Sequence, residues 1–395
     1  MSEIKVNSIK GVGASAAAIT VNNTDGTCTA NITNNLSNRN KLINGAMAIS
    51  QRQTSRTGTG GGSDYFLCDR WRIFSANTSA RFTISQEQDT SGAPGLPYSF
   101  KFDCTTADTS LAASDFLGIQ QKIEGQNVQD FLKGTSSAKK FTLSFYVKTN
   151  KSGVYTVELR DNNNSRQCSK TFTVSDGNWN RYTVSFPADT TGAFNNNNND
   201  SLQVNWWLIA GSTYTGGTLN TSGWASQTNA NRVSSSNVNI GDSTSNNFEL
   251  TGIQLEVDHT GSGVATDFEH LSVAEELRRC QRYFAKYSSI GSNYAQFLLT
   301  TGYSTDTDSR GMFHFVVEMR AANPSFSYSG SSGNVSDFVD MGGKAINLFQ
   351  ITNDGTGKNT GIRCIFSGSN TSAGFSHVIR ANNTANAFFA FDAEL

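Results

Sequence analysis

Residues 141–186 read FTLSFYVKTNKSGVYTVELRDNNNSRQCSKTFTVSDGNWNRYTVSF, and this stretch decides the fold class. Apolar and polar residues alternate within four segments, which turn-forming Asn, Gly, Ser and Asp residues separate from one another. The segments are residues 141–148, 154–160, 168–174 and 179–186. Period-two alternation with turn signals at short intervals is typical of antiparallel strands. We therefore predict an all-β protein with an antiparallel β-sandwich at its centre.

The sandwich continues beyond this stretch. Residues 202–210 form a more continuous apolar run, which predicts a central strand, and residues 248–257 predict the last strand of the block. Three polar stretches lack apolar periodicity and predict loops, which are residues 53–63, 194–200 and 211–239. Long loops in compact domains are often functional.

Both flanks of the sandwich have their own patterns. The polar N-terminal segment contains two short strand patterns, and two short strands need a partner because they cannot form a core. Ser272 and Glu275 have the spacing of a capping box and predict a helix that continues through Tyr287. Further strand patterns follow at 312–319, 345–351, 361–366 and 387–395. We expect an N-terminal segment at 1–40, a sandwich at 41–270, a linking helix at 271–288 and a smaller C-terminal β domain at 289–395.

Composition excludes several classes of protein. The 395 residues include 31 basic and 32 acidic ones, and a net charge of −1 argues against a general nucleic-acid binder. Aromatic residues make up 11% of the chain, so most of it is folded. No apolar run approaches the roughly 18 residues of a membrane-spanning helix, so we expect no membrane insertion. The six cysteines are scattered and predict reduced thiols.

The sequence contains no recognisable catalytic constellation. None of the four histidines has metal-ligand spacing to another His or Cys, and no nucleotide-binding or nucleophile motif is present. We therefore expect no catalytic activity. A glycan depolymerase remains an alternative, because it needs only a pair of carboxylates. The candidates stand beside turns and are Asp64, Asp69, Asp161, Asp176 and Glu256.

Binding chemistry is better represented. Sugars are bound by aromatic faces together with Asn, Asp and Arg side chains that hydrogen-bond to hydroxyl groups. The strand pair that carries Arg160, Arg166 and Trp179 could present such a surface, and Trp224 in its polar loop is the best exposed candidate. Tyr65, Trp71 and Trp206 could also present such a surface. Trp71, Trp179, Trp206 and Trp207 are, however, residues more typical of a sandwich core.

Several segments, taken in order, resemble a known family. They are NKLINGAM at 40–47, DRW at 69–71, the strands at 141–151, 155–161 and 179–186, and LTGIQLEV at 250–257. The chain resembles phage tail-fibre-like virion proteins, of the marine and cyanobacterial phage type, with a jelly roll like that of carbohydrate-binding modules. The N-terminal MSEIKVNSI and the closing FDAEL fit the same family more weakly.

The resemblance implies a fold and a role. It implies a jelly-roll sandwich, a homotrimer without catalytic residues or a cofactor, and a place in the virion with other phage proteins at the N-terminus. The residues expected to dock there are Ile4, Val6, Ile9, Ile19 and Val21. Jelly rolls of this kind often hold a structural Ca²⁺ ion, for which Asp103 and Glu256 are candidate ligands. A receptor-binding tip would expose Tyr303, Phe326, Tyr328 and His377.

The expected function is that of a tail fibre that binds a host cell-surface receptor, a glycan or a protein, during adsorption. The candidate glycan-binding residues are Trp224, Arg160, Arg166, Trp179, Tyr303 and Tyr328. The alternative is a capsid fibre, decoration protein or tail-knob protein with a purely structural role.

Overall fold

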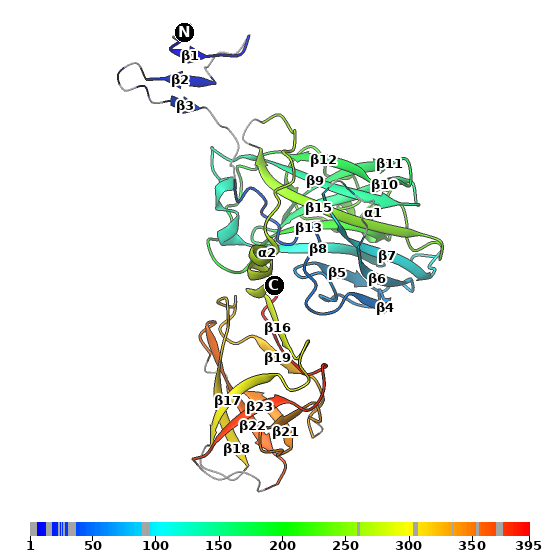
Figure 1. Ribbon diagram of the computed structural model, residues 1–395. Coiled ribbons are helices and arrows are strands. Elements are labelled where there is room, and N and C mark those ends of the chain that lie inside the picture. Colours follow the sequence, from blue (N-terminus) through cyan, green and yellow to red (C-terminus); the bar gives the residue numbers. More distant parts are fainter. Residues whose placement is uncertain are drawn as a thin grey trace.

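The fold is all-β, as predicted, with one helix longer than a single turn among the described residues (Figure 1). The computed structural model describes residues 6–12, 18–22, 24, 26, 28–30, 37–88, 93, 95–258, 261–302, 307–333, 335–352, 355–368 and 374–395. Within these ranges, no helix is long and apolar enough to cross a membrane.

A small sheet stands at the N-terminal end of the molecule (Figure 1). It has the order β1-β2-β3, with β1 at Ser8–Ile9, β2 at Ile19–Val21 and β3 at Cys28–Ala30. The first two strands fall where the sequence predicts strands. The third strand was not predicted, because three residues are too few to establish a pattern.

Two six-stranded antiparallel sheets form the central sandwich. The sheet that we call the front sheet has the order β14-β11-β10-β13-β8-β5, and the back sheet has the order β12-β9-β15-β7-β6-β4. The front strands are β14 (Ala225–Ser226), β11 (Arg166–Val174), β10 (Gly153–Asp161), β13 (Asp200–Ala210), β8 (Phe116–Glu124) and β5 (Arg72–Ala76). The back strands are β12 (Asn180–Phe186), β9 (Lys140–Thr149), β15 (Asn247–Asp258), β7 (Tyr98–Thr106), β6 (Arg81–Gln88) and β4 (Ser55–Thr59).

The deciding stretch supplies β9 to β12, and the two predicted flanking strands are the central strands β13 and β15. Strand β4 lies inside the segment 53–63, so the prediction that this whole segment is a loop was wrong. Its Ser-, Thr- and Gly-rich sequence has no apolar alternation because the strand is at a sheet edge and is exposed over four of its five residues.

Alternate side chains of both sheets fill the core. Val157 and Leu159 of β10 point inward, and Phe145 of β9 approaches the buried Trp206 with ring centroids 5.4 Å apart. Trp71 also packs against Trp206, with ring centroids 5.9 Å apart. These two tryptophans are at most 1% exposed, so they are core residues and not a sugar-binding surface.

The polar segments around the sandwich contain short turns of helix. They are η1 (Gly125–Asn127), η2 (Gln129–Phe131), α1 (Ser212–Thr215) and η3 (Asn229–Asn231). Strand β14 also lies in the segment 211–239, which the sequence predicts as a loop.

Helix α2 (Val273–Gln281) follows the sandwich and begins as predicted. The Ser272 hydroxyl oxygen accepts a hydrogen bond from the Glu275 backbone N–H at 3.2 Å. The helix ends at Gln281, so the prediction that it continues through Tyr287 was wrong. Residues Phe284–Ser288 instead form β16, because cross-strand pairing with β24 replaces the helical hydrogen bonds and the two faces of the strand bury Phe284 and Ala285.

The C-terminal part contains two further antiparallel sheets. One has the order β16-β24-β19, with β24 at Phe388–Asp392 and β19 at Ser325–Tyr328. The other has the order β20-β23-β17-β18-β22-β21. Its strands are β20 (Phe338–Asp340), β23 (Ser376–Ala381), β17 (Gln296–Gly302), β18 (Asp308–His314), β22 (Asn359–Phe366) and β21 (Ile346–Ile351). Strand β18 ends at His314, five residues before the predicted end.

Aromatic rings fill the space between these two sheets. Phe389 lies at the centre, 5.0 Å from both Phe338 and Phe349 between ring centroids. Phe313 and Phe391 continue the cluster at 4.9 Å. Offset and edge-on aromatic packing of this kind contributes beyond simple area burial.

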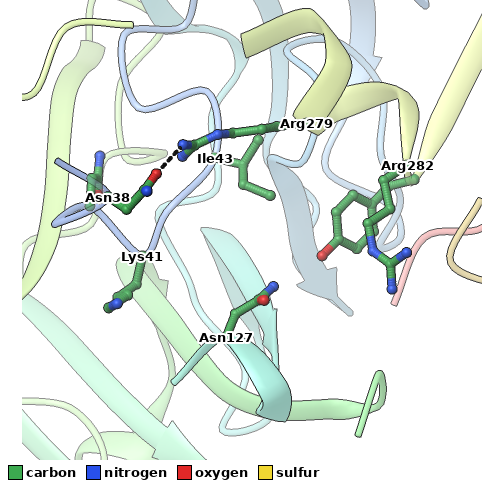
Figure 2. Close-up of a pocket in the computed structure, with 8 residues that line it drawn as sticks. Asn38, Lys41, Ile43, Asn127, Arg279 and Arg282 are labelled. Carbon is green, nitrogen blue, oxygen red and sulfur yellow. Dashed lines mark hydrogen bonds between the residues drawn. The ribbon is translucent and has the colours of Figure 1, made fainter. Parts of the chain in front are cut away.

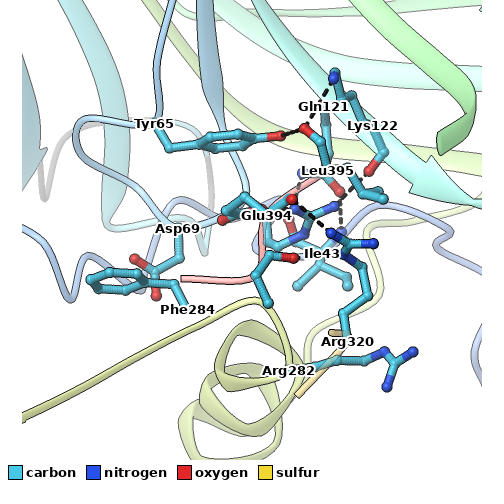
Figure 3. Close-up of polar contacts among 12 residues, drawn as sticks. Ile43, Tyr65, Asp69, Gln121, Lys122, Arg282, Phe284, Arg320, Glu394 and Leu395 are labelled. Carbon is cyan, nitrogen blue, oxygen red and sulfur yellow. Dashed lines mark hydrogen bonds and ion pairs between the residues drawn. The ribbon is translucent and has the colours of Figure 1, made fainter. Parts of the chain in front are cut away.

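Residues 393–395 return to the sandwich and are held there by polar contacts (Figure 3). Arg70 is 1% exposed, pairs with Glu394 and has its guanidinium 3.5 Å from the ring centroid of Tyr283. Lys122 donates a hydrogen bond to the carbonyl oxygen of Leu395 at 2.9 Å. Arg320 donates to the carbonyl oxygen of Glu394, also at 2.9 Å. This network joins the C-terminal strands to the sandwich.

Candidate functional site

The outer face of the front sheet carries a row of polar side chains. Because Val157 and Leu159 face the core, Glu158 and Arg160 face outward. Strand register places Arg160 beside Gln203 and Gln203 beside Lys122. One step along the sheet, Gln120 lies between Arg72 and Asn205. We call Arg72, Gln120, Lys122, Arg160 and Gln203 the polar strip.

The amides of the polar strip connect its charged groups. The Gln203 Oε1 atom accepts hydrogen bonds from Gln120 Nε2 and from Arg160 Nη1, each at 3.2 Å. Gln120 Oε1 accepts from Arg72 Nη1 at 3.2 Å. Gln227, from the segment 211–239, accepts a hydrogen bond from Arg160 Nε at 2.7 Å. Side chains held in this way need little reordering when a ligand binds.

The charges near the strip are partly removed from water. Asp200 accepts a hydrogen bond from Gln203 and lies 3.5 Å from Lys122, and the two side chains are 14% and 18% exposed. Burial raises the pKa of the Asp200 carboxyl and lowers the pKa of the Lys122 ammonium. One oxygen of Asp200, Oδ1, has no hydrogen-bond partner within the described part of the chain.

The other half of the outer face is aromatic and covered. Trp207 is 1% exposed, and its ring lies 5.1 Å from Phe74 and 5.2 Å from Tyr214 of α1. Arg232, from the segment 211–239, pairs with both oxygens of Glu158 at 2.8 and 2.9 Å and lies over Trp207. The segment 211–239 thus closes this half. In the polar strip, Arg72, Lys122 and Arg160 remain partly exposed, whereas Gln120 and Gln203 are buried, at 5% and 4% exposed.

Close packing under this cover requires a glycine. A Cβ atom at Gly118 of β8 would lie 2.1 Å from the Trp206 carbonyl oxygen and 2.5 Å from the Phe74 ring. The absence of a side chain at this position lets Phe74 lie flat across the sheet.

Of the predicted glycan-binding residues, Arg160 belongs to the polar strip, and Arg166 and Trp224 lie together. Arg166 makes two hydrogen bonds to Asp189, at 2.7 and 3.0 Å, and a third to the Trp224 carbonyl oxygen. Trp224 was predicted to be exposed but is half-buried, because its ring packs 5.8 Å from Phe141 and its indole N–H donates to Pro187. These contacts hold the segment around Trp224 against the sandwich.

The structure does not bring the remaining predicted residues to the strip. Trp179 lies in the turn after β11, at the end opposite Arg166, and Lys148 approaches its ring at 5.8 Å. Tyr328 of β19 is half-buried against the C-terminal core, 5.2 Å from Phe349. Tyr303 lies outside the described residues. Phe326 is half-buried and His377 is 5% exposed, so neither forms an exposed tip.

Of the predicted docking residues, Ile9, Ile19 and Val21 lie in the small N-terminal sheet, and Val6 precedes it. Val6 and Ile9 are 46% and 54% exposed, and Ile19 and Val21 are half-buried. Ile4 lies outside the described residues.

The carboxylates are scattered. Asp103 pairs with Asn247 at one end of β15, whereas Glu256 lies near the other end and accepts hydrogen bonds from Thr266. They cannot share one Ca²⁺ ion. Among the described residues, no group of three or more His, Cys, Asp or Glu side chains could hold a metal ion. The other carboxylate candidates have separate partners, such as Lys133 for the buried Asp161.

A hollow of about 340 Å³ lies where residues 38–43 meet α2 and η1 (Figure 2). Three cations line it, and each has a partner. Lys41 pairs with Asp130 at 2.7 Å, Arg279 donates to Asn38, and Arg282 binds both oxygens of Glu124 at 2.9 and 3.0 Å. Lys41 thus connects the segment 38–43 to η2, Arg279 connects it to α2, and Arg282 binds β8. Each of these three cations is already paired among the described residues.

Sequence reasoning missed most of the polar strip. The alternation LQVNWW in β13 contains a signal, since Gln203 and Asn205 are polar residues at every second position of an apolar run. Strands β5 and β8, which supply Arg72, Gln120 and Lys122, were not predicted.

The five cysteines with described side chains are free and buried: Cys68, Cys104, Cys168, Cys280 and Cys364.

Comparison with known proteins yields partial likenesses of fold. No family model and no curated protein matches the chain. Similar solved structures include the enzymatically active domain of bacteriophage CBA120 tailspike protein 4, with 12% identity and a TM-score of 0.29 over 57% of this chain and 23% of that one. TmCBM61 in complex with β-1,4-galactotriose has 11% identity and a TM-score of 0.27, over 56% and 99%. A cyclase from Fischerella sp. TAU has 11% identity and a TM-score of 0.31, over 55% and 96%.

The chain thus spans about a quarter of the tailspike domain that it matches. These neighbours include both a sugar-bound protein and enzymes. Because all three TM-scores are low, the neighbours carry no argument about what this chain binds or whether it is catalytic.

Proposed function

We propose that this protein is a phage virion protein, a tail fibre, that binds a host cell-surface glycan during adsorption. The observation that carries the proposal is the polar strip. Its partly exposed guanidinium and ammonium groups offer donors to the hydroxyl groups of a sugar chain, and the buried amides of Gln120 and Gln203 hold Arg72 and Arg160 in place. The resemblance of residues 40–287 to tail-fibre-like proteins supports the biological setting.

Adhesion by this route tolerates a weak site. The proposed assembly is a homotrimer in the virion, attached to other phage proteins through the small N-terminal sheet. Several linked copies raise the effective concentration of each site, so the total avidity exceeds the affinity of one site. A measured solution mass of one chain would count against the trimer.

The alternative is a purely structural virion protein, such as a capsid fibre, decoration or tail-knob protein. The amides of the strip already hydrogen-bond to one another, and this favours the alternative because such contacts also suit a surface with no ligand. A ligand is therefore needed to separate the two functions.

The test is binding of the purified protein to an array of bacterial surface glycans, with wild type and Arg160→Gln compared. Arg160 lies in the strip, and Gln removes its charge while retaining a polar group. Arg278→Gln, at an exposed position of α2, is the matched control. We expect binding by the wild type and the control, and loss of binding by Arg160→Gln. Equal binding by all three proteins would remove the strip from the proposal, and no binding by any would favour the structural alternative.

A further inference from the structure

A second cleft, of about 320 Å³, lies between the sandwich and the C-terminal sheet β16-β24-β19. The sandwich contributes residues from 52 to 66, and the sheet contributes its outer face. This face is distinct from the aromatic core, because Ala285 and Phe389 point into the core whereas Lys286 and Phe388 point toward the cleft. Such clefts between two packed parts are common ligand sites.

Three cations in the cleft are each held over an aromatic ring. Arg52 lies 3.7 Å from the ring centroid of Phe284, and Arg56 lies 4.2 Å from that of Phe66. Lys286 lies 4.8 Å from the ring centroid of Phe388. A guanidinium group stacked on a ring keeps the N–H groups in its plane free to donate hydrogen bonds.

Two of these cations have no carboxylate partner. Arg52 is neutralised by Asp392 at 2.8 Å and lies near Glu394 and Asp69. Within the described ranges, by contrast, neither Arg56 nor Lys286 forms an ion pair. The Lys286 ammonium donates a hydrogen bond only to the Arg52 carbonyl oxygen, at 3.2 Å. Burial lowers the pKa of the Lys286 ammonium.

In the described structure, the carboxylates that line the cleft do not form ion pairs with Arg56 or Lys286. Asp392 is occupied by Arg52, and Asp64 is exposed, with one oxygen accepting from the Tyr65 backbone N–H. The lining therefore has three cations and two carboxylates, a net positive charge next to aromatic surface. Gln53 and Ser327 add groups that can hydrogen-bond to hydroxyls.

We propose that this cleft binds an anionic sugar, whose carboxylate or sulfate group is held by Arg56 and Lys286. Charge-assisted hydrogen bonds from both cations would bind the anion, and the ring faces and polar side chains would bind the sugar. The proposal rests on the proposed glycan-binding function and gives it a substrate class. The polar strip would then bind neutral parts of a glycan, and the cleft its acidic residues.

The experiment measures binding of the full chain to four probes by isothermal titration calorimetry. The probes are α-1,4-trigalacturonate, neutral α-1,4-galactotriose, a sulfated galactotriose and hexaglutamate. We expect at least one anionic sugar to bind about tenfold more tightly than the neutral one, because a charge-assisted contact is worth about that factor. This excess should shrink between about 0.05 M and about 0.5 M salt, since the cleft is open to solvent.

The variants are Arg56→Gln and Lys286→Gln, with Arg278→Gln as the control at an exposed site away from the cleft. Arg56 is exposed, so its variant is expected to fold, and circular dichroism checks this for both. Each cleft variant should lose the preference for the anionic probe and keep the affinity for the neutral one. The two anionic sugars together identify carboxylate or sulfate as the recognised group.

Three results would overturn the proposal: no preference for either anionic sugar, an unchanged preference in both cleft variants, or equally tight binding of hexaglutamate. Failure of this proposal is distinct from failure of the proposed function. Binding of neutral glycan that is sensitive to Arg160→Gln would preserve the function while the cleft proposal falls.

Discussion

The two halves of the front sheet's outer face differ although the same strands build them. In the aromatic half, the segment 211–239 covers Phe74 and Trp207, and the charged Arg232 is fully matched by Glu158. In the polar strip, the amides of Gln120 and Gln203 bind Arg72 and Arg160, and neither arginine forms an ion pair in the described structure. A charged side chain that is buried under a covering segment needs an ion-pair partner. A partly exposed charged side chain can stay without one and so can bind a ligand.

The largest expected loss of stability comes from removing the Arg232–Glu158 ion pair in the aromatic half. Arg232→Ala would leave the Glu158 carboxylate buried, with its main partner removed. We expect the free energy of unfolding to fall by about 3 kcal/mol, since unpaired buried charges cost about that much. Urea unfolding measures it. Arg278→Ala at the exposed helix position should change stability by less than about 0.5 kcal/mol, and a similarly small loss for Arg232→Ala would contradict the account.

The second-largest expected loss of stability comes from disturbing the close packing at Gly118, beneath the segment 211–239. Gly118→Ala places a Cβ against the Trp206 carbonyl oxygen and the Phe74 ring, so we expect a loss of about 2 kcal/mol in unfolding free energy. Gly62→Ala is the matched control, because nothing lies within 4 Å of its Cβ position. Thermal melting compares the two variants. Equal melting temperatures would show that the aromatic half is loosely packed.

A substitution in the polar strip should change glycan binding more than it changes stability. Arg72→Gln removes one hydrogen bond to Gln120 at the edge strand of the sheet, so we expect a stability loss below about 1 kcal/mol. Glycan binding should nevertheless weaken by about tenfold, because a charge-assisted contact to the ligand is lost. Calorimetry with an array-selected glycan, together with urea unfolding, separates these effects. A large stability loss without a change in affinity would make the strip structural.

The smallest effect is a pH dependence from Asp200. Burial raises its pKa above 3.8, so the folded state binds the proton more tightly than the unfolded state. Stability from this group is therefore fully present below pH 3.8 and is lost as the pH rises through the raised folded pKa. Asp200→Asn removes this loss. We expect the stability of the variant, relative to wild type, to increase as the pH rises from about 4 toward neutrality. A difference that does not depend on pH would contradict this assignment.

The sequence predicted the sandwich well because alternation is a local signal. The segment 154–160 places Arg160 on the outer face once Val157 and Leu159 are taken as core, and the structure agrees. The neighbours of Arg160 in space could not be predicted, because Gln203 and Lys122 come from distant strands whose register depends on the whole fold. Trp224 shows the same limit, since its polar surroundings in sequence concealed its packing against Phe141.

The central claim is that the polar strip serves host recognition. The direct measurement is adsorption competition, in which purified protein is added to host cells before the phage and the free phage are counted. Wild-type protein and Arg278→Gln should reduce adsorption in a saturable way, whereas a folded Arg72→Gln/Arg160→Gln variant should not. Undiminished adsorption with folded, oligomeric wild-type protein, or equal competition by the strip variant, would contradict the account.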